Sequence, residues 1–328
     1  MIVRSISPAS GRREVAVTID DLPVISVTRP DVASHRAITT RLLEALAAHG
    51  VPAVGFVNEK NLVAGGVADP ARVALLRQWL DAGLELGNHT FGHLDLHAVP
   101  AARFEDDVVR GEPVIRGLLE ARGLPLRWFR HPYLRTGTDL AIKRRVEAFL
   151  AGRGYRVAPV TVDTDDWCFA AAYDRAVERG DAAAARRAAD EYVPYLESRF
   201  TYFESLSRRL LGYEVRQVLL LHANAINAER FDALARRLER RGYSFVTLER
   251  ALEDPAYGAT DEYAAPGGIS WLSRWALNQG CPADFLAGEP ETPPFVRALS
   301  GEGAAGRLVR LWNRVHRVRR RIAGAGAA

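Results

Sequence analysis

The sequence of 328 residues predicts an α/β fold built on a mostly parallel sheet. Short apolar runs rich in Val, Leu and Phe alternate along the chain with longer amphipathic segments, a pattern typical of βαβ units. Strands of this composition belong in parallel sheets whose faces are covered by helices. The sheet is either open and doubly wound or closed as a barrel, and both arrangements place a functional site at the carboxyl ends of the strands.

Seven runs have strand character, and four of the segments between them have helical periodicity. The predicted strands are residues 15–19, 51–57, 84–88, 127–131, 155–162, 217–222 and 243–248. The predicted helices are residues 38–49, 71–82, 104–122 and 228–240.

Two stretches of the chain break this alternation. Residues 168–216 separate two strand candidates and are rich in Ala and Arg, so we expect a helical insertion on the side of the site. After about residue 250 the sequence becomes rich in turns, with isolated apolar patches. We therefore expect a main domain at residues 1–250 and an extension at residues 251–328 that packs on it.

The composition indicates a globular protein without a disulfide framework. Hydrophobic residues make up 48% of the chain and charged residues 26%, which are ordinary values. No apolar run approaches the roughly 18 residues of a membrane span, and the N-terminus lacks the apolar core of a secretory signal. We expect a cytoplasmic protein, unless a leader precedes this sequence. Cys168 and Cys281 are expected to be free thiols.

The net charge of +4 comes from the C-terminus of the chain. Residues 307–321 contain seven arginines and no acidic residue, and the remainder has 37 basic and 40 acidic residues. We therefore expect no nucleic-acid binding by the main domain. Apolar residues recur at helical spacing in the same stretch, which predicts a basic amphipathic helix. Such a helix can make weak contact with an anionic membrane surface, pack on its own domain, or bind a partner subunit.

Five of the predicted strands end in polar residues that a core would not need. These residues are Asp20 and Asp21, His89 and His93, Arg130 and Tyr133, residues 163–167, and His222. In a parallel sheet the five strand ends converge on one rim. Two histidines spaced H-x-x-x-H can share a divalent cation such as Zn²⁺, which then takes an anionic third ligand. Taken alone, the H-x-x-x-H pair or the doublet of Asp20 and Asp21 is more often an ordinary surface or turn feature. The prediction depends on the combination of these motifs at strand ends.

These strand-end motifs, TIDD, HTFGH, RHPY, DTDDW and LLLH, resemble in order the five motifs of the polysaccharide deacetylase family, the NodB homology domain of carbohydrate esterase family 4. The resemblance implies a distorted, TIM-like (β/α) barrel of about seven parallel strands. It also implies a metal-dependent hydrolase that removes an N- or O-acetyl group from a sugar or oligosaccharide by attack of metal-bound water. One divalent ion is expected, with Zn as the first choice and Co, Ni or Mn as alternatives.

The resemblance assigns roles to the residues around this ion. Asp21, His89 and His93 would be the metal ligands, and the neighbouring Asp20 would be the general base. Arg130 would pair with Asp20, because an opposite charge within a few Å favours the ionised carboxylate.

Further roles follow from the later motifs. The backbone N–H of Tyr133 would stabilise the oxyanion. His222 would be the general acid, with Asp166 orienting its ring and raising its pKa. Substrate contacts are expected at Trp167 and Leu220, which could hold an acetyl methyl group, and at His131. His97 has no role in the family and is expected to be structural.

The sequence also departs from the family pattern. Leu22 and Pro23 follow the first motif where the family usually has Gly, and the third motif continues as PYLRTG where the family usually has Tyr-Gly. Bulkier residues suggest a narrowed cleft, so a long polysaccharide chain is in doubt. Two alternatives stay open: the same chemistry on a non-sugar amide, formamide or cyclic imide, and a non-catalytic carbohydrate-binding module. The oligomeric state is not indicated by the sequence.

Overall fold

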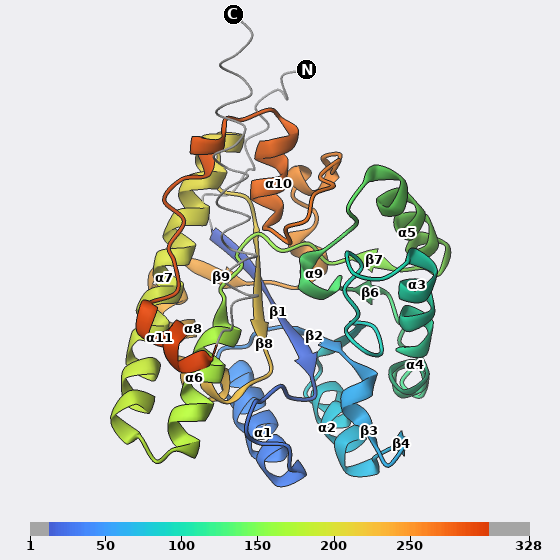
Figure 1. Cartoon of the computed structure of the whole chain (residues 1–328), viewed down its shortest axis with the longest axis vertical. Coiled ribbons are helices and arrows are strands. Elements are labelled where there is room, and N and C mark those ends of the chain that lie inside the picture. Colours follow the sequence, from blue (N-terminus) through green and yellow to red (C-terminus); the bar gives the residue numbers. More distant parts are fainter. Residues whose placement is uncertain (1–12, 302–328) are drawn as a thin grey trace, which may run out of the picture.

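A parallel sheet forms the centre of the computed structural model, which describes residues 13–301 (Figure 1). Its strands are β1 (Arg13–Leu22), β2 (Val54–Val57), β5 (Glu85–Asn88), β6 (Trp128–Phe129), β7 (Arg156–Val157), β8 (Gln217–His222) and β9 (Tyr243–Phe245). Within the described residues the sheet has seven strands in the order β7-β6-β5-β2-β1-β8, with β9 also paired to β1. Each of these strand pairs is parallel.

The sheet curves until its two edges meet. The backbone N–H of Val162, in the segment after β7, donates to the carbonyl of Val218 in β8 at 3.0 Å, and the N–H of Leu220 donates back to Val162 at 3.0 Å. This bridge between Val162 and Leu219 is parallel, like the rest of the sheet. The predicted distorted barrel of about seven parallel strands is confirmed.

Strand β1 is the central strand, because it pairs with β2, β8 and β9. Val15, Val17 and Ile19 are buried on one face of the strand and Ala16 and Thr18 on the other, which suits a strand covered on both faces. Its register places Asp20 opposite His222 of β8. The carboxyl ends of β1 and β8 therefore lie at one level and present their polar residues to the same rim.

Helices cover the outside of the sheet. They are α1 (Val32–Ala48), α2 (Pro70–Asp81), α3 (Ala101–Arg110), α4 (Pro113–Glu120), α5 (Leu140–Gly152), α6 (Asp166–Glu178), α7 (Ala182–Leu211), α8 (Ala225–Arg240), α9 (Leu248–Ala251), α10 (Trp271–Asn278) and α11 (Pro294–Ser300). Figure 1 shows α3, α4 and α5 on one side of the sheet and α6, α7, α8 and α11 on the other. Among residues 13–301, no helix combines the length and apolar character needed to span a bilayer.

Helices α6 and α7 occupy most of the stretch for which an insertion was expected, and α10 and α11 lie in the expected extension. Helix α11 packs against α6, and α10 packs against α7. The later part of the chain thus lies against α6 and α7. The boundary near residue 250 stays a prediction, and the basic stretch 307–321 lies outside the described residues.

The single helix predicted at residues 104–122 is wrong, because it is divided into α3 and α4 at Gly111. A Cβ atom at Gly111 would lie 2.6 Å from the backbone carbon of Thr90, so the chain passes too close to the 88–93 loop for any other residue. Pro113 then occupies the first turn of α4, where it needs no hydrogen-bond donor. A short hairpin that the sequence did not predict, β3 (Val63–Ala64) with β4 (Val67–Ala68), turns at two glycines.

The start of α4 is bound by a buried carboxylate. Glu59 is 4% exposed, and its Oε1 accepts the N–H groups of Val114 and Ile115 at 2.8 Å each. Burial raises the pKa of Glu59 to about 7, although the two hydrogen bonds act in the opposite direction. Because the folded state then binds the proton more tightly than the unfolded chain, folding stability falls as the pH rises from about 4.5 to about 7.

We expect Glu59→Gln to remove this part of the pH dependence, since an amide oxygen still accepts both N–H groups but carries no charge. Between about pH 5 and pH 8 the unfolding free energy of the natural protein should fall by about 2 kcal/mol relative to the variant. Urea denaturation at several pH values measures this difference. Glu120→Gln, an exposed change at the C-terminal end of α4, is the control. Parallel pH profiles for the natural protein and Glu59→Gln would contradict the assignment.

Candidate active site

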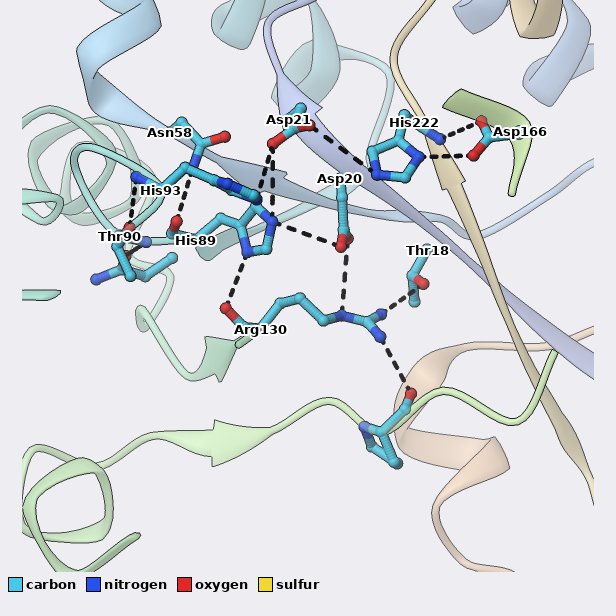
Figure 2. A network of polar contacts seen from close by, with 12 residues as sticks. Thr18, Asp20, Asp21, Asn58, His89, Thr90, His93, Arg130, Asp166 and His222 are labelled. Atoms are coloured by element: carbon cyan, nitrogen blue, oxygen red, sulfur yellow. Dashed lines mark hydrogen bonds and ion pairs between the residues drawn. The ribbon is translucent and has the colours of Figure 1, made fainter. Parts of the chain in front are cut away.

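The polar residues predicted at strand ends lie together at the carboxyl rim of the sheet (Figure 2). Asp20 and Asp21 lie just before the last residue of β1, His222 ends β8, His89 directly follows β5, and Arg130 directly follows β6. The register explains the convergence, because Leu22 pairs with Val57, Val57 with Asn88, and Asn88 with Phe129 at successive strand ends.

Asp21, His89 and His93 form a compact group of metal-ligand atoms. Oδ1 of Asp21 lies 3.7 Å from Nε2 of His89 and 3.7 Å from Nε2 of His93. The three ligand atoms lie within 4.8 Å of one another. Side chains at these distances can share a single ion.

The protonation of the two imidazoles suits a cation. Nδ1 of His89 lies 2.8 Å from the carbonyl oxygen of Arg130, and because a carbonyl only accepts, Nδ1 carries the proton and Nε2 presents a lone pair. Burial and the neighbouring His93 hold the pKa of His89 well below its usual range. Burial also lowers the pKa of His93, although the charge of Asp21 opposes this. Two neutral imidazoles and one carboxylate fit a divalent cation of the Zn²⁺ type, without identifying the element.

The loop that carries both histidines is held by side chains on several strands. Asn88 Oδ1 accepts the N–H of Thr90 at 2.7 Å, and Thr90 Oγ1 accepts the N–H of His93 at 2.9 Å. Asn58, just after β2, donates from Nδ2 to the carbonyl of His89 at 2.6 Å. Thr90 and His93 have φ angles of 67° and 55°, which non-glycine residues rarely adopt. These hydrogen bonds therefore position the imidazoles at some cost in backbone strain.

Asp20 faces a buried arginine. Nε of Arg130 lies 3.6 Å from Oδ1 of Asp20, and Nη2 donates to Thr18 Oγ1 at 2.6 Å. Burial raises the pKa of Asp20 to about 6, while the charge of Arg130 acts in the opposite direction. The other oxygen of Asp20 lies 3.6 Å from His89 Nε2, directly beside the ligand group. Asp20 is thus a carboxylate that is mostly ionised at neutral pH but able to take a proton.

His222 faces the ligand group from the opposite side. Its Nε2 lies 3.9 Å from Oδ2 of Asp21, and its Nδ1 lies 2.6 Å from Oδ1 of Asp166. The second oxygen of Asp166 accepts hydrogen bonds from the backbone N–H of His222 at 2.9 Å and from Nδ2 of Asn227 at 2.6 Å. Burial alone would lower the pKa of His222, but the charges of Asp166, Asp21 and Asp20 outweigh it and raise the pKa to about 10. The ring is therefore cationic in this arrangement.

The remaining predicted site residues lie in different surroundings. The ring of Tyr133 meets that of His93 edge to face, with centroids 4.4 Å apart. Trp167 is 41% exposed next to Asp166 at the start of α6, whereas Leu220 is buried in β8. A common acetyl pocket formed by Trp167 and Leu220 stays a prediction.

His131 points into the core. Its ring stacks on Phe104 with centroids 6.0 Å apart and meets Phe129 edge to face at 5.0 Å. Neither ring nitrogen has a hydrogen-bond partner within residues 13–301. A substrate would reach this ring only if that packing opened, so His131 has no part in the function proposed below.

Sequence reasoning missed the polar side chains that hold the site residues in place. They are Thr18, Asn58, Asn88, Asn224 and Asn227. Asn58 follows the second strand run, so the strand-end pattern that identified the other residues could have found it. Asn224 caps the N-terminus of α8, which explains its presence there without reference to a site.

Comparison with known proteins gives a consistent picture. The family model described as "Polysaccharide deacetylase" matches residues 8–150. A chitin deacetylase from Pestalotiopsis sp is 31% identical over 153 residues, which are 46% of this chain and 43% of that protein. A chitooligosaccharide deacetylase from Bradyrhizobium sp. (strain ANU 289) is 32% identical over 164 residues, 50% of this chain and 63% of that protein. The chain thus spans less than two thirds of either curated relative.

Among solved structures, a mutant of a CE4 family pseudoenzyme from Bacillus anthracis shares the fold, with a TM-score of 0.50 and 17% identity. The match covers 74% of this chain and 68% of that one. This likeness shows the fold alone. The family model and the two curated relatives, together with the ordered motifs and the converging strand ends, place residues 8–150 of the chain in the polysaccharide deacetylase family, the NodB homology group of carbohydrate esterase family 4.

Proposed function

We propose that the protein is an active deacetylase that removes an N- or O-acetyl group from a sugar or oligosaccharide and releases acetate. The observation that carries the proposal is the position of two acid–base pairs on opposite sides of one ligand group: Asp20 with Arg130, and His222 with Asp166. The names of the two curated relatives, which act on chitin and chitooligosaccharides, support N-acetylated oligosaccharides as the first substrates to test.

Asp21, His89 and His93 would hold the divalent ion. Because both imidazoles are already neutral, neither would have to lose a proton from its ligand nitrogen when the ion binds. The bound ion would supply Lewis-acid polarisation of the acetyl carbonyl and would lower the pKa of the attacking water. Asp20 takes the proton of that water, and Arg130 keeps the carboxylate oriented. The water oxygen bonds to the acetyl carbon, and the N–H of Tyr133 is assigned to the resulting oxyanion.

His222 then donates its proton to the departing nitrogen or oxygen of the sugar as the bond to the acetyl carbon breaks. The amine or alcohol leaves, and the acetyl group leaves as acetate. The two raised pKa values suit this division of work, because Asp20, with a pKa of about 6, is mostly ionised at neutral pH while His222, with a pKa of about 10, is protonated.

A second candidate is the same chemistry on a small, less polar amide such as a formamide or cyclic imide. It is favoured by the loop after β1, where Ile25 is 38% and Val27 is 53% exposed. The N–H of Ile25 donates to the carbonyl of Ala223 at 2.8 Å, which places this apolar loop beside His222. The departures from the family at Leu22 and Pro23 precede the same loop.

The main test is hydrolysis by the purified protein after metal removal and reconstitution with Zn²⁺, Co²⁺, Ni²⁺ or Mn²⁺, followed as acetate release for the acetylated sugars and as ring opening for the cyclic amides. N-acetylated chitooligosaccharides, O-acetylated sugars and small cyclic amides are the substrates. We expect acetate from at least one acetylated sugar and none after chelation. Turnover of the cyclic amides alone would favour the second candidate, and no turnover with any substrate or metal would favour a binding module.

Removal of either proton-transfer group should abolish most of this activity. We expect Asp20→Asn and His222→Ala each to lower kcat by about 10² to 10⁴, the usual contribution of a general acid or base. Steady-state kinetics on the best substrate measures the effect. Asp139→Asn, an exposed change that preserves the cap of α5, is the control. Near-normal turnover by either variant would refute the role given to that residue.

The pairing of His222 with Asp166 can be tested without substrate. In the metal-free protein, Asp166→Asn removes the largest influence that raises the pKa of His222, so this pKa should fall by about one to three units. NMR titration of the histidine ring protons measures it, with His222→Ala to assign the resonance. Asp174→Asn, which changes another buried carboxylate of α6, should leave the value unchanged. An equal pKa in the natural protein and Asp166→Asn would contradict the pairing.

A further inference from the structure

The turn at Pro132–Leu134 holds an unfavourable backbone conformation beside the ligand group. Tyr133 has φ 57° and ψ 15°, and Leu134 has φ 54°, so two consecutive non-glycine residues are left-handed. Each costs on the order of 1 kcal/mol or more, and such a turn persists only where its surroundings hold it. Its first hydrogen bond runs from the N–H of Leu134 to the carbonyl of His131 at 3.1 Å. Tyr133 comes one residue before Leu134, so its own N–H takes no part in the hydrogen bonds of the turn. This N–H can therefore donate to a ligand.

Arg274 of α10 binds the carbonyl side of this turn. The side chain is fully buried, and its Nη2 donates to the carbonyl of Leu134. Its Nη1 donates to Thr136 Oγ1 at 3.0 Å, and its Nε donates to the carbonyl of Ile269 at 3.2 Å. The guanidinium also lies 3.9 Å from the ring centroid of Trp271. This rigid fork therefore joins the turn to residues that lie more than a hundred positions later in the chain.

Two further contacts join the same segments. A Cβ atom at Gly268 would lie 1.7 Å from the carbonyl oxygen of Tyr133, so only glycine permits this approach. His97 Nε2 accepts the N–H of Gly137 at 3.1 Å, and its Nδ1 lies 3.3 Å from the carbonyl of Pro266. Residues 261–274, which we call the brace, thus contact the turn and the residues after it directly at Arg274 and Gly268, and indirectly through His97.

The charges around the brace allow Arg274 to be removed. Asp261 binds Arg274 Nη1 at 3.1 Å and Lys143 Nζ at 2.8 Å. Lys143 also lies 3.3 Å from Thr136 Oγ1. Because Asp261 has two cationic partners, loss of Arg274 leaves the carboxylate paired, and the cost of an unpaired buried charge does not arise.

We propose that the brace positions the Tyr133–Leu134 turn for catalysis, with Arg274 as the positioning residue. The proposal rests on the proposed function, in which the N–H of Tyr133 faces the oxyanion. Arg274 makes no contact with substrate in this role. It fixes the carbonyl end of a strained turn, so that the N–H at the other end stays aligned with the site.

The kinetic test compares Arg274→Met with the natural protein, both as full chains loaded with metal. A displaced oxyanion donor weakens only the transition state, so kcat should fall about tenfold to hundredfold while KM changes by less than about threefold. Arg274→Lys can bind Asp261 but cannot supply the fork to Leu134 and Thr136, so its kcat should be intermediate.

Lys143→Met is the matched control, because it removes the other buried cation bonded to Asp261 and Thr136 and makes no bond to Tyr133 or Leu134. Its kcat should stay within about twofold of the natural value even where its unfolding midpoint drops. An equal loss of kcat in Lys143→Met and Arg274→Met, or a change in KM alone, would overturn the proposal.

A structural measurement that needs no substrate tests the role of the brace independently of the proposed function. Crystal structures of Arg274→Met and of Gly268→Ala should show Tyr133 or Leu134 leaving the left-handed region. Gly268→Ala acts on the Tyr133 carbonyl without changing a charge, and it serves where Arg274→Met does not fold. An unchanged turn in the variant that folds would refute the role of the brace. A moved turn in a protein that hydrolyses no acetyl substrate would instead refute the proposed function alone.

Discussion

Two neighbouring carboxylates buried at the end of the central strand impose the constraint on which the rest of the site depends. Asp20 and Asp21 are 2% and 5% exposed, and buried carboxylates cost several kcal/mol unless charges or hydrogen bonds compensate them. Arg130 compensates Asp20, whereas Asp21 faces His222 at 3.9 Å and two imidazoles whose pKa values are lowered. A divalent cation is the remaining partner that this geometry accommodates. The parallel sheet brings these partners to the doublet, since His222 comes from the end of β8, His89 from the end of β5 and Arg130 from the end of β6.

The strands and most of the site could be predicted because both follow local rules. Apolar runs of strand length identified all seven strands of the sheet, and parallel pairing aligns their carboxyl ends whatever lies between them. Polar residues at those ends, such as Asp20 and His222, therefore had to meet. Thr18 was not predictable in the same way, because a threonine inside a strand is ordinary, and its bond to Arg130 depends on a residue 112 positions away.

The features that could not be predicted depend on close approach between distant segments. Gly111 divides a helix because the backbone at Thr90 passes beside it, and Gly268 permits contact with the carbonyl of Tyr133. In the sequence, each glycine sits where helical or turn character explains it locally. Arg274 is similar, since an arginine on a short helix is usually exposed and its burial results from the fork to Leu134 and Asp261. A single sequence contains no evidence of contacts between residues that lie so far apart along the chain.

The residues of the candidate site come from two different parts of the chain. The family model matches residues 8–150, which include the ligand group, Asp20, Arg130 and the Tyr133 turn. His222, Asp166 and the brace lie beyond that range. In the proposed function, the first part thus contains the metal ligands, the general base and the oxyanion donor, whereas the proton donor and the support of the strained turn come from later elements packed on the same rim. On this argument, changes in the later elements should alter kcat far more than metal affinity, because they act on groups whose interactions strengthen only in the transition state.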